Sequence, residues 1–268
     1  MTTAANDEER AAGRGYEALF VPALFAPWTT HIIEAIDIRP EDHVLDIACG
    51  SGVLARHAHR LTGPSGRVVG LDAAPGMISA ASEMNAEIVW IVGSAEDLPF
   101  DNASFDHAIS QFGIMFFADR EEAARETARV LKPRGRFAFA AWGPLEDNPA
   151  YKRVATLLDR LVSPAAGDAV RVPFSFSSQS EAESLFREAG FEAVTSVSKT
   201  ETATFPSPRV MVEAELRGWL PMFGITLDEA EIESVLTDVD SELSEFTTDE
   251  GTAEFPTAAY IISGQKPF

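Results

Sequence analysis

Between residues 43 and 142 the chain alternates short apolar runs with amphipathic segments. The apolar runs, rich in Val, Ile, Phe and Ala, cover residues 44–48, 67–72, 88–92, 105–110 and 136–142. Segments with apolar residues at helical spacing lie between them, at 53–61, 75–84 and 119–131. Strands with little polar alternation are typical of a parallel sheet that is covered on both faces. We therefore expect an α/β fold with a doubly wound sheet and right-handed crossovers.

The pattern after residue 142 is less regular. Proline and serine interrupt residues 144–179, where we expect one helix, at 151–161. A helix at 181–189 is closed by Gly190, and a strand at 191–197, more helix and a final strand at 258–263 follow. Five apolar residues at helical spacing predict an amphipathic helix in the segment 228–254.

Charge excludes some classes of partner. The chain has 42 acidic against 21 basic residues, a formal net charge of -21, which repels phosphate backbones and anionic lipid. We therefore expect no nucleic-acid partner. Eleven acids and no base fall in residues 228–254, which predicts a solvated acidic helix face. With 4 Lys against 17 Arg, the acidity fits a solubility role or a salty or GC-rich source.

Cysteine content and targeting signals point to the cytoplasm. Cys49 is the only cysteine, which excludes an intrachain disulfide and argues against a thiolate metal cluster, so we expect no metal. The N-terminus is polar and no run of 18 apolar residues occurs, so we expect no membrane span. The sequence is compatible with a homodimer.

The loop after the first predicted strand is the place to look for chemistry, because ligands of parallel sheets bind at the carboxyl ends of strands. Gly50 and Gly52 in this loop let a ligand approach the main chain, and the next helix offers free amide groups. Together with Ala55 and with Asp72, which ends the second strand, they also match the dinucleotide fingerprint. A nucleotide-type ligand is therefore expected.

Asp46 discriminates between the candidate ligands. It lies just before the glycine loop, where a carboxylate would repel the pyrophosphate of NAD but attract the cationic ammonium and sulfonium of S-adenosylmethionine. The competing interpretation is that Asp46 only caps the following turn.

Four motifs stand in order at typical spacings: VLDIACGSG at 44–52, GLDAAPGM at 70–77, GSAEDLPF at 93–100 and RVLKPRG at 129–135. Together they resemble the class I S-adenosylmethionine-dependent methyltransferases, of the small-molecule type similar to ubiquinone/menaquinone biosynthesis methyltransferases. The resemblance is strong over residues 40–142. It implies a Rossmann-like sheet of seven strands with the last strand antiparallel. The strands at 191–197 and 258–263 would be the sixth and seventh.

The resemblance also implies roles for individual residues. The methionine end of S-adenosylmethionine would be held by Asp46, Gly50 and Gly52, the ribose by Asp72, and the adenine by Met77, Ser94, Ala95 and Glu96, with Ala48, Ser51 and Ala73 beside them. Gln111 and Phe112 would lie near the transferring methyl group. Two departures matter: Ala48 replaces the first glycine of the loop, and Ser94 replaces an Asp that commonly contacts the adenine amino group.

We expect a single methyltransferase domain over residues 1–268. Residues 1–40 would form an N-terminal helical cap, 41–142 the cofactor-binding core, and 143–268 the cap inserts and the last two strands. The activity would be in-line methyl transfer to a small hydrophobic or aromatic acceptor.

The acceptor would contact aromatic residues of the cap, among them Tyr16, Phe20 and Trp28. Alternatively, these rings form the core of the cap itself. His31 is a weak candidate for a catalytic base, since it lies in the same segment.

Two other functions stay open at this point. One is an NAD(P)-dependent oxidoreductase that uses the loop containing Gly50, Gly52 and Ala55. The other is a non-catalytic module whose acidic 228–254 face binds a basic partner, an association that salt would weaken.

Overall fold

The computed structural model describes residues 4–176 and 178–268, and the chain divides into two compact units. The first unit comprises Met1–Trp142, Phe176–Lys199 and Ala259–Phe268, and the second comprises Gly143–Ser175 and Thr200–Ala258. Among the described residues, no helix is long and apolar enough to cross a membrane.

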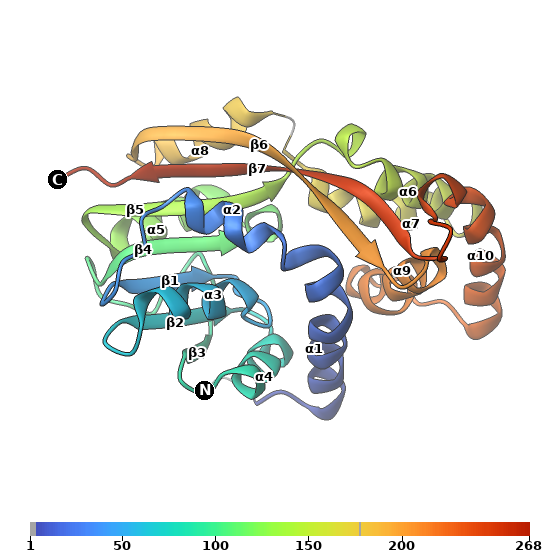
Figure 1. Ribbon diagram of the computed structural model, residues 1–268, viewed down its shortest axis with the longest axis horizontal. Helices are drawn as coiled ribbons and strands as arrows, with labels where there is room; N and C mark the ends of the chain where they lie inside the picture. Colours follow the sequence, from blue (N-terminus) through green and yellow to red (C-terminus); the bar gives the residue numbers. More distant parts are fainter. Residues whose placement is uncertain (1–3, 177) are drawn as a thin grey trace. The chain divides into compact units, whose positions relative to one another are not determined.

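One seven-stranded sheet runs in the order β3-β2-β1-β4-β5-β7-β6 (Figure 1). Its strands are β1 (His43–Ile47), β2 (Arg67–Asp72), β3 (Val89–Val92), β4 (Phe105–Gln111), β5 (Leu131–Trp142), β6 (Glu192–Phe205) and β7 (Ala253–Gln265). The pairs β1–β2, β2–β3, β1–β4 and β4–β5 are parallel, and β7 pairs antiparallel with β5. The expected doubly wound sheet with an antiparallel last strand is confirmed.

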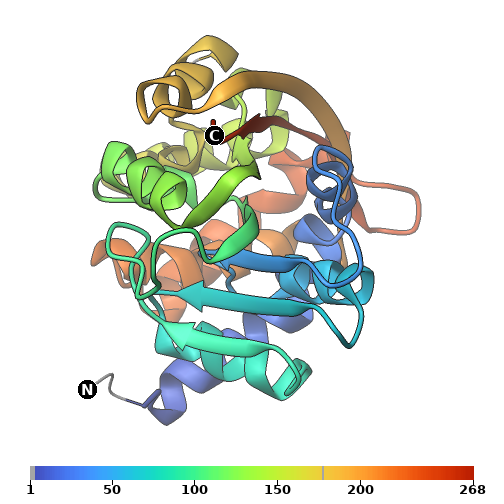
Figure 2. The same cartoon turned by 90° about the vertical axis from the view of Figure 1, so that its left-hand side faces the viewer.

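Helices cover both faces of the sheet within the first unit. The helices α2 (Trp28–Glu34) and α3 (Val53–Thr62) lie on one face, and α5 (Arg120–Val130) and α8 (Gln179–Glu188) on the other (Figure 2). α4 (Pro75–Met84) links β2 to β3. Burial on both faces explains the apolar strands: Val44, Leu45 and Ile47 of β1 are at most 1% exposed.

The N-terminal segment is helical, as expected, but irregular. α1 (Asp7–Phe20) starts at a capping box in which Asn6 and Glu9 bond each other's backbone amides, and three acids occupy its first turn. It continues into a π-helix at Val21–Phe25, which contains Pro22. α1 lies directly against α4 (Figure 1), since a Cβ added at Gly13 would lie 2.3 Å from the carbonyl oxygen of Gly76.

The second unit corrects two predictions. Residues 144–179 hold two helices in place of one, α6 (Pro149–Leu161) and α7 (Pro164–Arg171), the second capped by Ser163. The acidic segment is α-helical over α10 (Glu229–Glu242), a short 3-10 helix follows at Ser244–Phe246, and β7 already begins at Ala253. The regular apolar spacing ends at Leu243, and the polar residues that follow supply no further buried helix face.

The acidic face of α10 is matched by arginines of the same unit. Arg209 bonds both carboxylate oxygens of Glu233 at 2.7–2.8 Å, and Arg217 bonds both oxygens of Glu229 at 2.8 Å. Arg160 pairs with Asp238 and Glu242. The carboxylates of residues 228–254, a stretch without basic residues, are therefore partly neutralised by arginines from elsewhere in the same unit. This weakens the case for a basic partner.

Candidate functional site

The carboxyl ends of β1 and β4 lie side by side where the strand order reverses, so their loops lie at the same edge of the sheet. The loop after β1 turns through left-handed backbone angles, with φ of 56° at Ala48, 54° at Gly50 and 87° at Gly52. At the end of β4, Phe112 also has a positive φ of 56°. Left-handed angles at two residues with side chains are a strain that clusters at functional sites.

Asp46 lies beneath this loop, fully buried in the sheet. Neither carboxylate oxygen has a hydrogen bond of normal geometry, although the nearby amide of Ala55 favours the charged form. Burial, with a smaller contribution from Asp72, raises the pKa of Asp46 well above its usual range. A buried carboxylate without a partner is costly, and a cationic ligand would remove that cost.

Asp72 connects the loop to the end of β2. Its Oδ2 accepts a hydrogen bond from the amide of Gly50 at 2.8 Å, and its Oδ1 accepts one from the amide of Ala74 at 2.9 Å. Burial raises the pKa of Asp72, while the two amides oppose that shift. The Asp72 carbonyl also accepts from the amide of Gly93 at 3.0 Å, which places the loop after β3 next to it.

In that next loop, Ser94 is exposed and Ala95 is buried. The Ser94 hydroxyl donates to Glu96, whose other oxygen accepts from the amide of Ala118 at 2.8 Å. These hydrogen bonds lower the pKa of Glu96 although its partial burial opposes them. The Glu96 carboxylate is thus bonded by Ser94 and by the Ala118 amide. The Ser94 oxygen accepts from the Glu96 amide at 3.3 Å and keeps one lone pair to accept a further hydrogen bond.

Two glycines allow the ring of Trp90 to pack under the site. A Cβ at Gly52 or at Gly70 would lie 2.3 Å from this ring. The Trp90 indole donates to the carbonyl of Asn85 at 2.7 Å. Cys49 is buried against the same place, and burial raises the pKa of its thiol well above the ordinary value. Cys49 is therefore a packing residue.

An aromatic cluster forms at the end of β4. Phe112 stacks on Trp142 with ring centres 3.7 Å apart and planes at 4°, and Trp28 meets both rings edge-on. The Gln111 amide donates to the carbonyl of Phe25 at 2.7 Å, which fixes the π-helix to β4. Trp28 is 0% exposed, so it supports the cluster from within.

α1 covers the glycine loop. The Tyr16 ring would touch a Cβ at Gly50, at 3.8 Å, and Tyr16 stacks on Phe25 with ring centres 5.3 Å apart. Burial and the charge of Asp72 raise the pKa of Tyr16. Tyr16 and Phe20 are half-buried, and their ring centres are 5.8 Å apart.

Within residues 4–176 and 178–268, the buried polar atoms without a hydrogen-bond partner concentrate in this region. They include Asp46 Oδ1 and Oδ2, Ser51 Oγ, Ser110 Oγ, Gln111 Oε1, Trp28 Nε1 and Glu17 Oε2. Buried polar groups in folded proteins are nearly always paired, so such a concentration fits a polar ligand. The residues present therefore fit a group that carries both cationic and hydrogen-bonding atoms.

The other predicted residues lie around the start of α4 and beside Trp28. Ala73 is exposed and Met77 half-buried around the start of α4. His31 lies half-buried with its ring edge-on to Trp28, at 5.7 Å between ring centres. His107 bonds Asp42 at 3.0 Å near the amino ends of the strands, away from the glycine loop.

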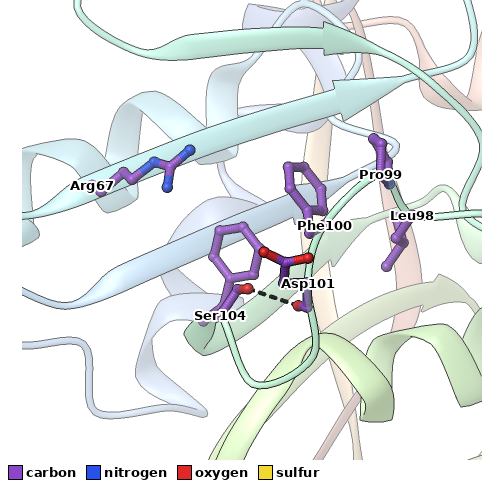
Figure 3. A pocket seen from close by; sticks show the side chains of 7 residues that line it. Arg67, Leu98, Pro99, Phe100, Asp101 and Ser104 are labelled. Carbon is purple, nitrogen blue, oxygen red and sulfur yellow. Dashed lines mark hydrogen bonds between the residues drawn. The ribbon is translucent and has the colours of Figure 1, made fainter.

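One surface hollow lies away from this chemistry, and another lies beside it, at Pro75, Trp90 and Val92. The first, of about 440 Å³, is lined by Arg67, Phe100, Phe105 and neighbouring residues (Figure 3). Arg67 and Phe105 are the first residues of β2 and β4, so this hollow is at the opposite end of the strands. The second, of about 470 Å³, lies against α4 and β3. Within residues 4–176 and 178–268, no group of His, Cys, Asp and Glu is arranged to hold a metal ion.

Sequence reasoning missed several residues of this region. The packing of the folded chain brings four further residues to the site: Ser110, Trp142, Glu17 and Arg56. Arg56 offered one signal, since it lies one turn beyond Gly52 on the helix that starts there.

The chain is similar to known methyltransferases in sequence and in fold. A family model described as a methyltransferase domain matches residues 45–139. The demethylmenaquinone methyltransferase of Symbiobacterium thermophilum is 32% identical over 185 residues, which cover 61% of this chain and 74% of that protein. Its counterpart in Staphylococcus carnosus is 29% identical over 181 residues, 62% and 75% of the two chains.

Two solved structures share the fold. The YcgJ protein from Bacillus subtilis has a TM-score of 0.57 at 25% identity, over 90% of this chain and 98% of that one. Phosphoethanolamine N-methyltransferase 2 of Haemonchus contortus, in complex with S-adenosyl-L-methionine, has a TM-score of 0.59 at 16% identity, over 97% and 57%.

Proposed function

This chain belongs to the class I S-adenosylmethionine-dependent methyltransferases, and we propose that it transfers the methyl group to a small hydrophobic or aromatic acceptor by in-line displacement. The observation that carries the proposed site is Asp46, a fully buried carboxylate beneath a left-handed glycine loop. Among the described residues neither of its oxygens has a hydrogen bond of normal geometry, although the Ala55 amide is nearby. This arrangement favours a cationic ligand over the pyrophosphate of NAD(P).

In the proposed cofactor site, the carboxylates of Asp46 and Asp72 have different roles. Asp46 compensates the positive charge at the methionine end, while Gly50, Ser51 and Gly52 bring the backbone close to it. Asp72 accepts hydrogen bonds from the ribose hydroxyls, because each of its oxygens still has a lone pair after bonding the amides of the loops.

Adenine would lie between the start of α4 and the loop after β3. Met77 supplies an apolar surface, and Ser94 and Ala95 supply the edge. Since the Ser94 hydroxyl donates its proton to Glu96, its oxygen is left to accept from the adenine amino group. We propose that Ser94 and Glu96 together do the work of the Asp that the family commonly has here.

The acceptor would bind beside Gln111 and Phe112, where half-buried Tyr16 and Phe20 supply apolar walls. Trp28 shapes this wall from behind, since it is fully buried. The similarity to demethylmenaquinone methyltransferases supports an aromatic, quinone-like acceptor.

S-adenosylmethionine supplies an activated methyl group whose departure leaves a neutral thioether. The task of the protein is therefore to hold the acceptor in line with the methyl and to exclude water. The stacked pair of Phe112 and Trp142 gives that position a rigid wall. His31 is the candidate for removing an acceptor proton, and its place beside Trp28 puts it in the same cluster.

Isothermal titration tests the proposed site. S-adenosylmethionine and its demethylated product should both bind, and Asp72→Ala should weaken binding of both severely. Asp46→Asn should weaken the sulfonium cofactor more than the product, which has one positive charge fewer. A folded protein that binds NADH and ignores S-adenosylmethionine would refute the assignment.

A further inference from the structure

A shielded ion pair joins α1 to the glycine loop. Arg56, in the first turn of α3, donates from Nη1 to the carbonyl oxygen of Ser51 at 2.6 Å. Its Nη2 lies 2.7 Å from Oε1 of Glu17 on α1. Both side chains are 15% exposed. Glu17 Oε2 is buried with no hydrogen-bond partner in the part of the chain that the structure describes, so this carboxylate relies on Arg56.

The glycine loop is held in shape by hydrogen bonds from side chains outside it. Its left-handed turn at Ala48 is unfavourable for a residue with a Cβ. Asp72 holds the Gly50 amide on one side, and Arg56 holds the Ser51 carbonyl on the other. The guanidinium fork suits this task, because its geometry serves two acceptors at once. Glu17 orients that fork, which connects the position of α1 to the shape of the loop.

We propose that Arg56 and Glu17 are positioning residues for methyl transfer, which hold the glycine loop in its cofactor-binding shape by tying it to α1. This inference rests on the proposed function. Neither residue has to contact the reacting atoms. Without Glu17, the guanidinium loses the partner that orients it and the Ser51 carbonyl loses a fixed donor. Bound cofactor should then leave more easily.

The test compares cofactor dissociation with stability. In Glu17→Gln, the dissociation rate of S-adenosylmethionine, followed by tryptophan fluorescence in a stopped-flow instrument, should rise about tenfold, within the usual range of coupling between sites. Arg56→Lys should show an intermediate effect, because an ammonium is not a planar fork. The effects of Glu17→Gln and Arg56→Gln should not add in the double variant, since both remove the same pair.

Arg14→Gln is the matched control. Arg14 joins the same helix to Glu83 of α4 across an exposed contact of 3.5 Å, with side chains 54% and 49% exposed. Its loss should leave dissociation within about twofold of the wild type. A lowered melting temperature with unchanged dissociation in Glu17→Gln would reduce the pair to a structural role. Equal effects of Arg14→Gln and Glu17→Gln would also overturn the inference. A wild-type protein that does not bind S-adenosylmethionine would contradict the proposed function itself.

Discussion

Glu215 should make the stability of this protein fall as pH rises. It lies in a π-helix (Glu215–Trp219) of the second unit and is 6% exposed. Burial raises its pKa from 4.5 to about 7. Between these two values the unfolded chain releases the proton first, so the native state holds more protons and loses stability with rising pH.

The magnitude follows from the size of that shift. A displacement of 2.5 pKa units at about 1.36 kcal/mol each costs the native state roughly 3 kcal/mol at pH 8, and about 1 kcal/mol at pH 5. Glu215→Gln removes the ionisation. The free energy of unfolding of this variant, relative to that of the wild type, should therefore increase by roughly 2 kcal/mol between pH 5 and pH 8. Urea unfolding at both pH values, followed by circular dichroism, measures the difference.

Glu254→Gln is the control, because Glu254 is an exposed glutamate of the same unit. Its difference from the wild type should be the same at both pH values. If Glu215→Gln also shows a constant difference, the carboxyl group of Glu215 is not shielded from water in solution, and the reasoning from burial fails.

Three further predictions concern the first unit. Gly13→Ala should destabilise the protein by about 1–3 kcal/mol, since its Cβ would meet Gly76, whereas Gly15→Ala on the same helix has open space and should be neutral or stabilising in thermal melts. Trp28→Ala should cost about 3–5 kcal/mol in urea unfolding, because this side chain is fully buried. The affinity for S-adenosylmethionine should rise with pH in the wild type, because the cationic ligand favours the ionised form of Asp46, whose pKa is raised. In Asp46→Asn the affinity should be weaker and should depend less on pH. Equal pH dependence of the affinity in the two proteins would contradict this reasoning.

Local pattern predicted the core of the fold well. The strand expected at 67–72 is β2 (Arg67–Asp72), and the helix expected at 75–84 is α4 (Pro75–Met84). The centre of β2 is a buried run, residues 68–71, and Pro75 marks the start of α4, so local signals bound both elements. The prediction from sequence was less accurate where pairing within the sheet sets the length of a strand. β6 (Glu192–Phe205) extends well past residue 197, through polar residues that local propensity does not assign to a strand.

The second unit shows the same limit for helices. α7 (Pro164–Arg171) was missed, because it is only 8 residues long and contains both Pro164 and Gly167, which are poor helix formers. Buried neighbours stabilise it, as the full burial of Ala166 shows. Likewise, the pairing of Arg209 with Glu233 joins residues 24 positions apart, so charge counted along the chain did not reveal it.

By itself the sequence determined the family, the order of strands and helices, and two carboxylates at the ends of adjacent strands, Asp46 and Asp72. These follow from short-range pattern and ordered motifs, which are written in neighbouring residues. The tertiary structure alone decided that Asp46 is buried without a hydrogen bond of normal geometry to any described residue, that Trp28 lies in the core, and that Arg56 joins Glu17 to the loop. Burial and pairing depend on which distant segments meet, and that is settled only when the chain packs.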